Sequence, residues 1–363
     1  MSELSLPLAE AADRLLSQRC DSRLVAAADA GQWPQALWQA VEELGPGQLL
    51  APEAEGGAGG DWLDACALLE RAAARCAPLP IAQTLLAGWL RSRVGLAPAA
   101  GPAAVAFTTA PLDALRAAGR ADLTEADGPV VAWADQASHV ALLGADDAGT
   151  AQLLWLPRAC VQVRAVAGGA WPAARVGSAG IPLHAAAGAR PTQAWCIALP
   201  GLSLAEVRAR AALLSAAQIA GALGRLLEMT VTYTGERVQF GRSIGQFQGV
   251  QHQLAQLAEE AAAARVAVQA AAATEDPRWF VAAAAAAKAR AGEAAGLGTR
   301  IAHQLHGAIG VTAEHTLHLY TRRLREWRDE HGSETFWARA LVQAIRQGGE
   351  RSAWQAVVAC TSR

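Results

Sequence analysis

Hydrophobic residues recur at helical spacing through the first part of the chain. Between Leu4 and about Val94 they fall three or four positions apart, with breaks at Gly45, at 55–60 (EGGAGG) and at 77–82 (APLPIA). This period gives each helix an apolar stripe that must be buried against a neighbour. Residues 1–100 are therefore predicted to form a small helical N-terminal domain.

Residues 101–200 show a different pattern, in which short apolar runs rich in strand-forming residues are separated by turn residues. Five or six runs of this kind within a hundred residues are typical of a compact β-barrel or sandwich. The runs are 104–107 (AVAF), 129–134 (PVVAWA), 139–144 (HVALLG), 152–157 (QLLWLP), 160–166 (CVQVRAV) and 194–199 (AWCIAL).

Long alanine-rich helical segments return in residues 201–363. Helices of this length with short connections indicate an antiparallel bundle of about four. The fold class is therefore predicted as α+β, with an N-terminal helical domain, a middle β-barrel or sandwich domain and a C-terminal four-helix bundle. The helices are expected at about 204–236, 248–273, 277–305, 313–329 and 333–348.

Composition limits the classes of partner and site that the protein can have. The formal net charge of −2 comes without a dense basic stripe, which argues against nucleic acid. Six cysteines are scattered singly, without the pairing of a disulfide frame or zinc site. The N-terminus lacks the pattern of a signal peptide, and the longest apolar run, 279–287, is too short to span a bilayer. We expect a cytoplasmic protein with small-molecule and protein partners, no membrane and no metal.

The connection between the first two long helices carries more chemistry than a turn needs. Residues 235–254 read GERVQFGRSIGQFQGVQHQL, with Arg237, Gln239 and Phe240 set among glycines. A helix-to-helix turn requires a glycine or two. The arginine, the amide and the aromatic ring beside them predict that a ligand or partner is held there.

Three stretches resemble the acyl-CoA dehydrogenases, flavoenzymes with this order of α, β and four-helix domains. They are 38–60 (WQAVEELGPGQLLAPEAEGGAGG), 236–260 (ERVQFGRSIGQFQGVQHQLAQLAEE) and 304–323 (QLHGAIGVTAEHTLHLYTRR). The resemblance covers almost the whole chain and is weak between 101 and 200. It implies the acyl-CoA dehydrogenase fold and the cofactor FAD. The implied reaction removes the α proton of an acyl-CoA thioester with a base and passes the β hydrogen to the flavin as hydride.

The resemblance also implies contacts that one subunit lends to its neighbour's flavin. Arg237 would pair with the pyrophosphate, Gln239 would hydrogen-bond nearby and Phe240 would pack on the cofactor. Gln304 and Gly307 would lie against the adenosine half, although the family's second glycine there is Ala308. A merely structural turn, and a helix end at Gly307, are the alternative interpretations.

The usual catalytic base is missing. The resemblance implies a glutamate at the position of His331, followed by Gly332 and by Ser333 as a further flavin contact. A second base position and the arginine that contacts coenzyme A correspond to alanines, Ala211 and Ala212. His331 is therefore the candidate base, since imidazole titrates near neutrality. Arg208 and Arg210 lie near the second position but out of register. Asp329, Glu330 and Glu334 flank His331 and could serve as the base after a local shift, but ordinary solvated charges explain them better.

The middle region lacks the segments that hold a subunit's own flavin ring in the family. Thr108 and Thr109 are present, but no Gly-Ser-Asp follows, and Trp133 is followed by Ala134 and Asp135 instead of Ile-Thr. Contacts lent to a neighbour are thus kept, while those of the chain's own site are lost.

This division resembles the partner subunit of heterotetrameric bacterial dehydrogenases that act on steroid side chains. We expect such a partner subunit, with a homologous subunit supplying the base, an acyl-CoA substrate and an electron-accepting flavoprotein as a further possible partner. Two alternatives stay open. One is a self-sufficient homo-oligomer with a displaced or histidine base, and the other is a non-catalytic scaffold or coenzyme A-ester binder.

Two further patterns are interpreted as chance. Residues 241–245 (GRSIG) fit the nucleophile-elbow pattern but follow a helix rather than a strand. His303 and His306 are one helical turn apart, but no cysteine or carboxylate pair accompanies them as metal ligands.

Overall fold

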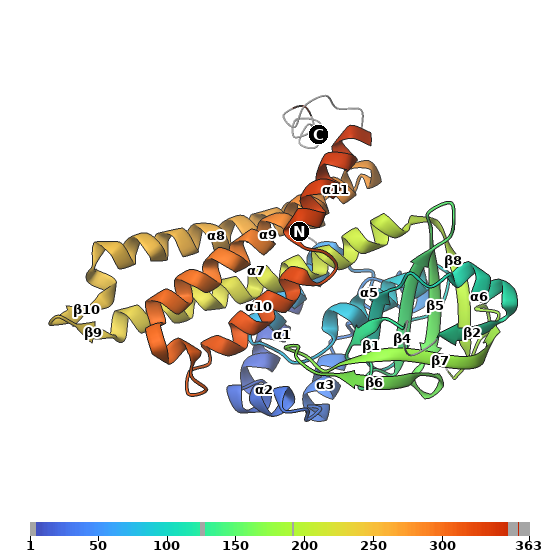
Figure 1. Cartoon of the computed structure of the whole chain (residues 1–363), viewed down its shortest axis with the longest axis horizontal. Helices are drawn as coiled ribbons and strands as arrows, with labels where there is room; N and C mark the ends of the chain where they lie inside the picture. Colours follow the sequence, from blue (N-terminus) through green and yellow to red (C-terminus); the bar gives the residue numbers. More distant parts are fainter. Residues whose placement is uncertain (1–4, 124–127, 191, 348–354, 356–363) are drawn as a thin grey trace.

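The structure, a computed structural model, describes residues 5–123, 128–190, 192–347 and 355. Within these residues the chain passes from N-terminal helices through a curled sheet to a long helical bundle (Figure 1). The predicted α+β fold class is confirmed. Cys360 lies outside the described residues, and the other five cysteines are free thiols, as expected.

The N-terminal region is helical as predicted, with non-helical segments at Gly45, 56–60 and 77–80, and with two further breaks, at 20–21 and 30–34, that the sequence analysis did not predict. The Asp21 carboxylate accepts from the Leu24 amide, and Asp61 and Asp64 form a reciprocal capping box. Such caps satisfy backbone amides that have no partner inside the helix. The elements are α1 (Ser5–Arg19), α2 (Ser22–Asp29), α3 (Gln35–Glu42), the one-turn η1 (Glu53–Glu55), α4 (Trp62–Ala74) and α5 (Ile81–Ser92).

The middle region forms one eight-stranded curled sheet rather than two packed sheets, so of the two expected arrangements the barrel is the nearer (Figure 1). Its main path runs β1-β4-β5-β8-β7-β2, with β3 and β6 both paired to β7. The elements are β1 (Ala103–Phe107), α6 (Leu112–Ala118), β2 (Arg120–Leu123), β3 (Val130–Ala132), β4 (His139–Ala145), β5 (Thr150–Pro157), the one-turn η2 (Arg158–Cys160), β6 (Gln162–Val166), β7 (Ala173–His184) and β8 (Ala194–Ser203).

Sequence patterning missed β7, the strand that holds the sheet together. It pairs with β2, β3, β6 and β8, yet its sequence contains Gly177, Gly180 and Pro182, which are usually turn residues. A register shift in the pairing with β2 accompanies this glycine-rich part. The short strand β2 and helix α6 were also missed. Here tertiary pairing outweighs the local preference of the residues.

The bundle follows the predicted helices closely. Ser203 caps its first helix, because the Ser203 hydroxyl accepts from the Glu206 amide at 3.1 Å. A small hairpin of β9 (Val238–Gln239) and β10 (Arg242–Ser243) projects from one end of the bundle, away from the sheet (Figure 1). The other elements are α7 (Leu204–Glu236), η3 (Ile244–Gln246), α8 (Gln248–Ala272), α9 (Pro277–His306), η4 (Gly307–Val311), α10 (Leu317–Asp329) and α11 (Glu334–Gln347).

The chain changes from helix to strand between α5 and β1, and back to helix at Leu204. The expected domain boundaries near residues 100 and 200 stay a prediction, because they concern independent folding. In the described part of the chain, no helix is long and apolar enough to cross a membrane.

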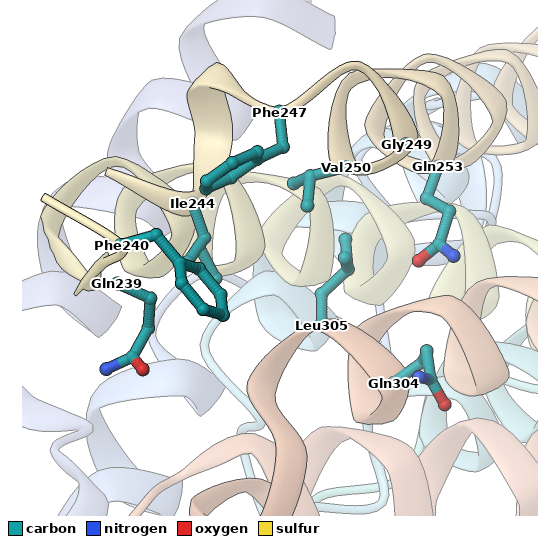
Figure 2. A pocket seen from close by; sticks show the side chains of 9 residues that line it. All are labelled: Gln239, Phe240, Ile244, Phe247, Gly249, Val250, Gln253, Gln304 and Leu305. Carbon is teal, nitrogen blue, oxygen red and sulfur yellow. The ribbon is translucent and has the colours of Figure 1, made fainter. Parts of the chain in front are cut away.

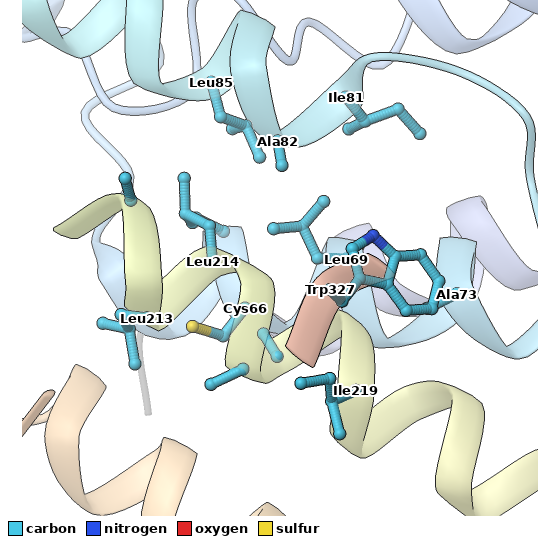
Figure 3. Close-up of a cluster of buried hydrophobic side chains, with 14 of the residues drawn as sticks. Cys66, Leu69, Ala73, Ile81, Ala82, Leu85, Leu213, Leu214, Ile219 and Trp327 are labelled. Atoms are coloured by element: carbon cyan, nitrogen blue, oxygen red, sulfur yellow. The ribbon is translucent and has the colours of Figure 1, made fainter. Parts of the chain in front are cut away.

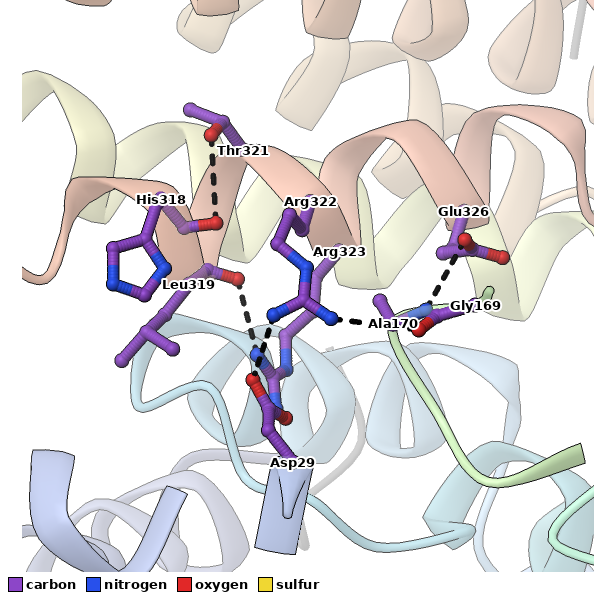
Figure 4. A network of polar contacts seen from close by, with 9 residues as sticks. All are labelled: Asp29, Gly169, Ala170, His318, Leu319, Thr321, Arg322, Arg323 and Glu326. Carbon is purple, nitrogen blue, oxygen red and sulfur yellow. Dashed lines mark hydrogen bonds and ion pairs between the residues drawn. The ribbon is translucent and has the colours of Figure 1, made fainter. Parts of the chain in front are cut away.

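A buried ion pair joins the N-terminal helices to the bundle. The Arg323 guanidinium on α10 is fully buried and donates to the Asp29 carboxylate at 2.8 Å and to the Leu319 carbonyl at 3.1 Å (Figure 4). Arg322 donates to the other Asp29 oxygen at 3.2 Å and to the Gly169 carbonyl at 3.4 Å. Segments far apart in sequence therefore meet on one face of α10.

The same face of α10 also holds the loop before β7. The Ala170 amide donates to Glu326 at 3.2 Å (Figure 4). The centre of the Trp171 ring lies 4.8 Å from the Arg323 guanidinium. Asp29 ends α2, where a helix dipole disfavours a carboxylate. Its position there is explained by the two arginines.

We predict that Asp29→Ala lowers the free energy of unfolding by about 3–5 kcal/mol, since it leaves the buried Arg323 charge without its partner. Denaturant unfolding of the purified chain measures this. The matched control is Asp135→Ala, which removes the exposed pair to Arg158 and should cost at most about 1 kcal/mol. Equal losses in the two variants would contradict the role assigned to Asp29.

Candidate functional site

A groove of about 380 Å³ lies between the projecting hairpin, the start of α8 and the end of α9 (Figure 2). It brings together three of the residues that the sequence singled out, Gln239, Phe240 and Gln304. Its walls combine apolar side chains with three glutamine amides. The lining residues are Gln239, Phe240, Ile244, Phe247, Gly249, Val250, Gln253, Gln304 and Leu305.

The hairpin tip holds Phe240 in an unfavourable conformation. Phe240 and Gly241 have φ of +54° and +79° and connect the paired residues Gln239 and Arg242, which is the two-residue turn with positive φ at both positions. An aromatic residue is rarely found at positive φ, and this conformation costs about 1–2 kcal/mol. The Phe240 side chain is also 93% exposed. Within the chain, an edge-to-face contact with Phe247 offsets these costs only in part, by about 0.5–1.5 kcal/mol.

Two arginines accompany the ring. Arg237 directly follows α7, is exposed, and its guanidinium forms no ion pair with any other residue that the structure describes. Arg242 lies with its guanidinium 4.2 Å from the Phe247 ring centre, and Phe247 meets Phe240 edge to face at 6.1 Å. The hairpin therefore presents positive charge and aromatic surface together.

The second half of the groove comes from the end of α9. Gln304 is exposed in its last turn, and Gly307 follows at φ +63°, where a side chain would be strained. Ala308 is exposed, so the departure from the family pattern leaves no clash within the chain. Gly310 is different, because a Cβ there would approach Leu317 at 2.8 Å and His306 at 3.0 Å.

His331 and Ser333 lie elsewhere, beyond the opposite end of α10, which at 13 residues separates them from the groove by roughly 20 Å. His331 has φ +62°, and its ring meets Phe107 edge to face at 5.6 Å. Burial lowers the pKa of His331 below its ordinary value, Glu330 opposes this, and Lys288 and Arg208 add to it. The imidazole is therefore neutral at neutral pH.

The nearby carboxylates are already engaged. Glu330 accepts hydrogen bonds from Gln83 at 3.1 Å and from Ser215 at 3.0 Å, and lies 3.8 Å from His331. Glu334 is paired with Arg328. In the described structure both carboxylates therefore have other partners, and neither is free to act as the catalytic base.

The positions that the resemblance assigns to a second base and a coenzyme A arginine are closed. Ala211 and Ala212 are buried in the core. Arg208 instead lies 4.4 Å from the Phe107 ring centre and 5.7 Å from that of Phe336. Arg210 pairs with Glu206 at 3.2 Å.

The space between α4, α5 and α7 is filled by side chains rather than left as a cavity. Leu69 and Cys66 on α4, Leu85 on α5 and Leu214 on α7 are among the side chains that meet there (Figure 3). A Cβ at Gly221 of α7 would overlap the Glu70 backbone of α4. The two helices are therefore in backbone contact.

Trp133, in the segment that the resemblance assigns to the flavin ring, is packed inside the protein. It is 4% exposed, has φ +65° and lies 6.2 Å from Trp33 and 5.7 Å from Trp171. Trp171 in turn lies 5.4 Å from Trp327. Three of the four non-glycine residues described at positive φ, namely Trp133, Phe240 and His331, thus fall in the segments singled out from the sequence. The fourth is Cys76.

Lys288 holds the His331 loop and was missed by sequence reasoning. It is the only lysine in the 363-residue sequence, is 1% exposed, and donates to the carbonyls of Trp327, Arg328 and Gly332 at 2.8, 2.7 and 3.2 Å. Burial lowers its pKa to about 8, so the ammonium form still dominates at neutral pH. Its three N–H groups match three carbonyls at the end of α10.

Phe247 and Gln253 in the groove were also missed. The repeated glutamines and phenylalanine of the GQFQGVQHQ run were the available signal. No group of three or more His, Cys, Asp or Glu side chains in the described part of the chain is arranged to hold a metal ion. His306 instead belongs to a packed aromatic cluster, stacked on Tyr233 at 4.5 Å, and His303 Nε2 lies 3.1 Å from the Thr321 hydroxyl oxygen.

Comparison with known proteins identifies the family. Residues 3–95 and 206–350 match the models of the N-terminal and C-terminal domains of acyl-CoA dehydrogenase. Acyl-CoA dehydrogenase IpdE2 of Mycobacterium tuberculosis is 33% identical over 302 residues, which cover 83% of each chain. The chain therefore belongs to the acyl-CoA dehydrogenase family.

Two solved structures share the fold. A variant of the Tcur3481-Tcur3483 steroid ACAD has a TM-score of 0.78 at 24% identity, covering 96% of this chain and 98% of its own. The ChsE4-ChsE5 complex of Mycobacterium tuberculosis has a TM-score of 0.77 at 20% identity, with the same coverage. Both likenesses extend over almost the entire chain, so the acyl-CoA dehydrogenase fold predicted from sequence is confirmed.

The groove residues suit part of an FAD molecule, the cofactor typical of this family. The apolar wall fits an aromatic ring system, and the amides fit its polar edges or a ribose. The Gln253 Oε1 atom is buried without a hydrogen-bond partner in the described structure, which leaves an acceptor for a ligand donor. The guanidinium of Arg237 suits a diphosphate.

We predict that Lys288→Met lowers the free energy of unfolding by roughly 3 kcal/mol, because three buried carbonyls lose their donor. Lys288→Arg should not restore it, since a planar guanidinium cannot take the place of a compact ammonium among three converging acceptors. Chemical denaturation measures both. Arg290→Met, on the same helix but in half-exposed pairs with Glu260 and Glu293, is the control and should cost at most about 1 kcal/mol. A loss as small in Lys288→Met would contradict the capping role.

Proposed function

We propose that this chain is the partner subunit of a heteromeric FAD-dependent acyl-CoA dehydrogenase. It lends flavin contacts through its hairpin and the end of α9, and a homologous subunit carries the catalytic base. The substrate is a bulky acyl-CoA, such as a steroid side-chain thioester. An electron-accepting flavoprotein is a further expected partner.

The observation that carries this proposal is Phe240. Its ring is 93% exposed at the tip of a projecting hairpin, at φ +54°. Both features cost free energy in the chain alone. Unfavourable backbone conformations persist where a ligand or partner requires them. A hairpin segment that exposes an aromatic ring and an arginine, the latter without an ion pair among the described residues, is suited to a neighbour's cofactor.

The closed interior supports the same division of labour. When bound, FAD would supply the hydride acceptor. In this chain Arg237 would bind the diphosphate, and the amides of Gln239, Gln253 and Gln304 would orient the polar edges of the cofactor. Proton removal from the acyl chain needs a carboxylate or imidazole beside an acyl pocket. Here the α4–α7 space is filled and Glu330 and Glu334 are engaged.

The names of the relatives support the substrate and the assembly. One structural neighbour is described as a steroid ACAD and another as a complex of two proteins. A chain of the same family that directs its flavin contacts outward, and whose described residues fill the space between α4, α5 and α7, fits one position in such a complex. The division of roles between the two subunits is our proposal.

One observation favours a second candidate, a self-sufficient homo-oligomer that uses His331 as the base. Burial lowers the pKa of His331, so its imidazole is neutral and able to accept a proton at neutral pH. Its position against Phe107 and beside Glu330 leaves it within the protein interior. The two candidates differ in what happens when the imidazole is removed.

We predict that Arg237→Ala weakens FAD retention in the assembled enzyme by about 1.5–3 kcal/mol, because one charge-assisted contact to phosphate is lost. Flavin content after dialysis, read from visible absorbance per protomer, measures this. The matched control is Arg164→Ala on the exposed strand β6, which should leave occupancy unchanged. Unaltered occupancy in Arg237→Ala would remove the cofactor interpretation of the hairpin.

We predict that His331→Ala leaves turnover of the mixed assembly nearly unchanged, since the homologous subunit supplies the base. Steady-state oxidation of an acyl-CoA with an artificial electron acceptor measures kcat and KM. A fall in kcat of about a hundredfold or more, the usual size of a general-base contribution, would favour the self-sufficient enzyme instead.

A further inference from the structure

The two halves of the groove come from different helices, and one residue pair joins them. The Tyr233 hydroxyl, four residues before Arg237, donates to the His306 carbonyl at 3.2 Å, two residues after Gln304. The two rings are stacked, with centres 4.5 Å apart and planes at 20°. This contact fixes the end of α7, which carries the hairpin, against the end of α9, which carries the η4 turn.

Both halves pack closely around this contact. A Cβ at Gly245 of the hairpin segment would lie 3.2 Å from the Thr234 carbonyl, next to Tyr233. A Cβ at Gly310 of η4 would lie 3.0 Å from the His306 Cβ and 3.5 Å from His303 Nδ1. Movement at the Tyr233–His306 contact therefore displaces both walls of the groove.

His306 is held as a neutral imidazole. It is 3% exposed, and its Nδ1 lies 2.8 Å from the Ala302 carbonyl, which assigns the hydrogen to Nδ1. Its Nε2 is buried without a hydrogen-bond partner in the described part of the chain. A proton on Nε2 would have no acceptor there, and burying an unpaired charge is costly.

The groups that face His306 add to this cost. The His315 ring lies 4.8 Å from it edge to face, and His303 is one turn earlier on α9. Burial lowers the pKa of His315, and His318 adds to this effect; burial likewise lowers the pKa of His303, and Arg325 adds to it. The titratable groups named around His306 are thus histidines and an arginine, together with the Tyr233 phenol. None of them is a carboxylate that would stabilise an imidazolium.

We propose that Tyr233 and His306 are positioning residues that hold the two halves of the flavin-contact groove together, and that this clamp opens when His306 gains a second proton. The proposal rests on the proposed function for its consequence, the release of flavin contacts in acid. The clamp itself is a property of this chain alone and can be measured without any flavin.

The stability of the Tyr233–His306 clamp depends on pH because the closed and open forms bind a proton on His306 with different affinities. Burial lowers the pKa of His306 below its ordinary value of 6.5, and His315 and His303 lower it further, while the bond to Ala302 opposes them. The clamp is therefore at full strength above pH 6.5, where open and closed forms are both neutral. It weakens as pH falls from 6.5 toward the lowered pKa, because the open form binds the proton more tightly.

The test is amide hydrogen exchange of the full chain, read by mass spectrometry as protection factors at pH 7.5 and 5.5. We expect protection of residues 304–312 and 237–247 to fall by up to about tenfold, which is the largest change that one proton can produce over one pH unit below 6.5. In His306→Phe, which keeps a stacked ring but cannot titrate, the fall should be absent. His184→Phe, an exposed histidine on the sheet, should behave as wild type.

Equal protection at both pH values in the wild type, or an unchanged fall in His306→Phe, would overturn the proposal. If His306→Phe does not fold, Tyr233→Phe decides the matter, because it keeps the ring and removes the hydroxyl. It should lower protection of both segments several-fold at pH 7.5 and keep the acid response. Normal protection in that variant would overturn the clamp.

A second measurement distinguishes failure of this proposal from failure of the proposed function. FAD retention of the mixed assembly is measured at the same two pH values. Loss of flavin in acid, cancelled by His306→Phe, supports both proposals. Absence of flavin at both pH values with an intact exchange response would overturn the proposed function and leave the clamp standing.

Discussion

The buried pair between Arg323 and Asp29 is the contact on which the arrangement of the three parts depends. Arg323 is fully buried, so its charge must be met inside the protein, and the carboxylate that meets it comes from an N-terminal helix. Arg322 and Glu326 extend the same face of α10 to the loop before β7. These contacts fix helix α10 along its length, and they thereby set the positions of the segments at its two ends.

The two ends of α10 have opposite characters. At one end, Lys288 gathers three carbonyls and the His331 loop is packed against Phe107, with Glu330 fully engaged. Near the other end, η4 follows the end of α9 that lines the groove, and Phe240 at the groove and Arg237 on the hairpin segment are exposed to solvent. The positive-φ conformation of His331 thus lies inside the protein, whereas that of Phe240 lies at a solvent-exposed hairpin tip. The proposed partner role explains the conformation of Phe240.

Much of the fold could be predicted from sequence, since helix periodicity and capping are local. The predicted helices at 204–236, 248–273 and 277–305 differ from the observed ones by one residue at most. Strand β7 was missed because its glycines and proline favour turns, and only its four partner strands make it a strand.

For the candidate site, too, sequence indicates the residues that lie in short motifs but not the features that depend on distant contacts. Gln239, Phe240 and Gln304, which the structure brings to one groove, were singled out with Arg237 because two short motifs mark them, and their contact with a cofactor stays a prediction. The positive φ of Phe240, the direction of Glu330 toward Gln83 and Ser215, and the capping by Lys288 depend on residues far away in the sequence. No local pattern carries that information.

The most direct test of the account is the visible spectrum and mass of the purified chain, alone and co-expressed with a family member that has the glutamate base. If the chain is a partner subunit, it should be colourless alone, and flavin absorbance should appear in a mixed assembly of defined mass. A yellow homo-oligomer that oxidises acyl-CoA without a second subunit would contradict it, as would a chain that stays colourless in every combination.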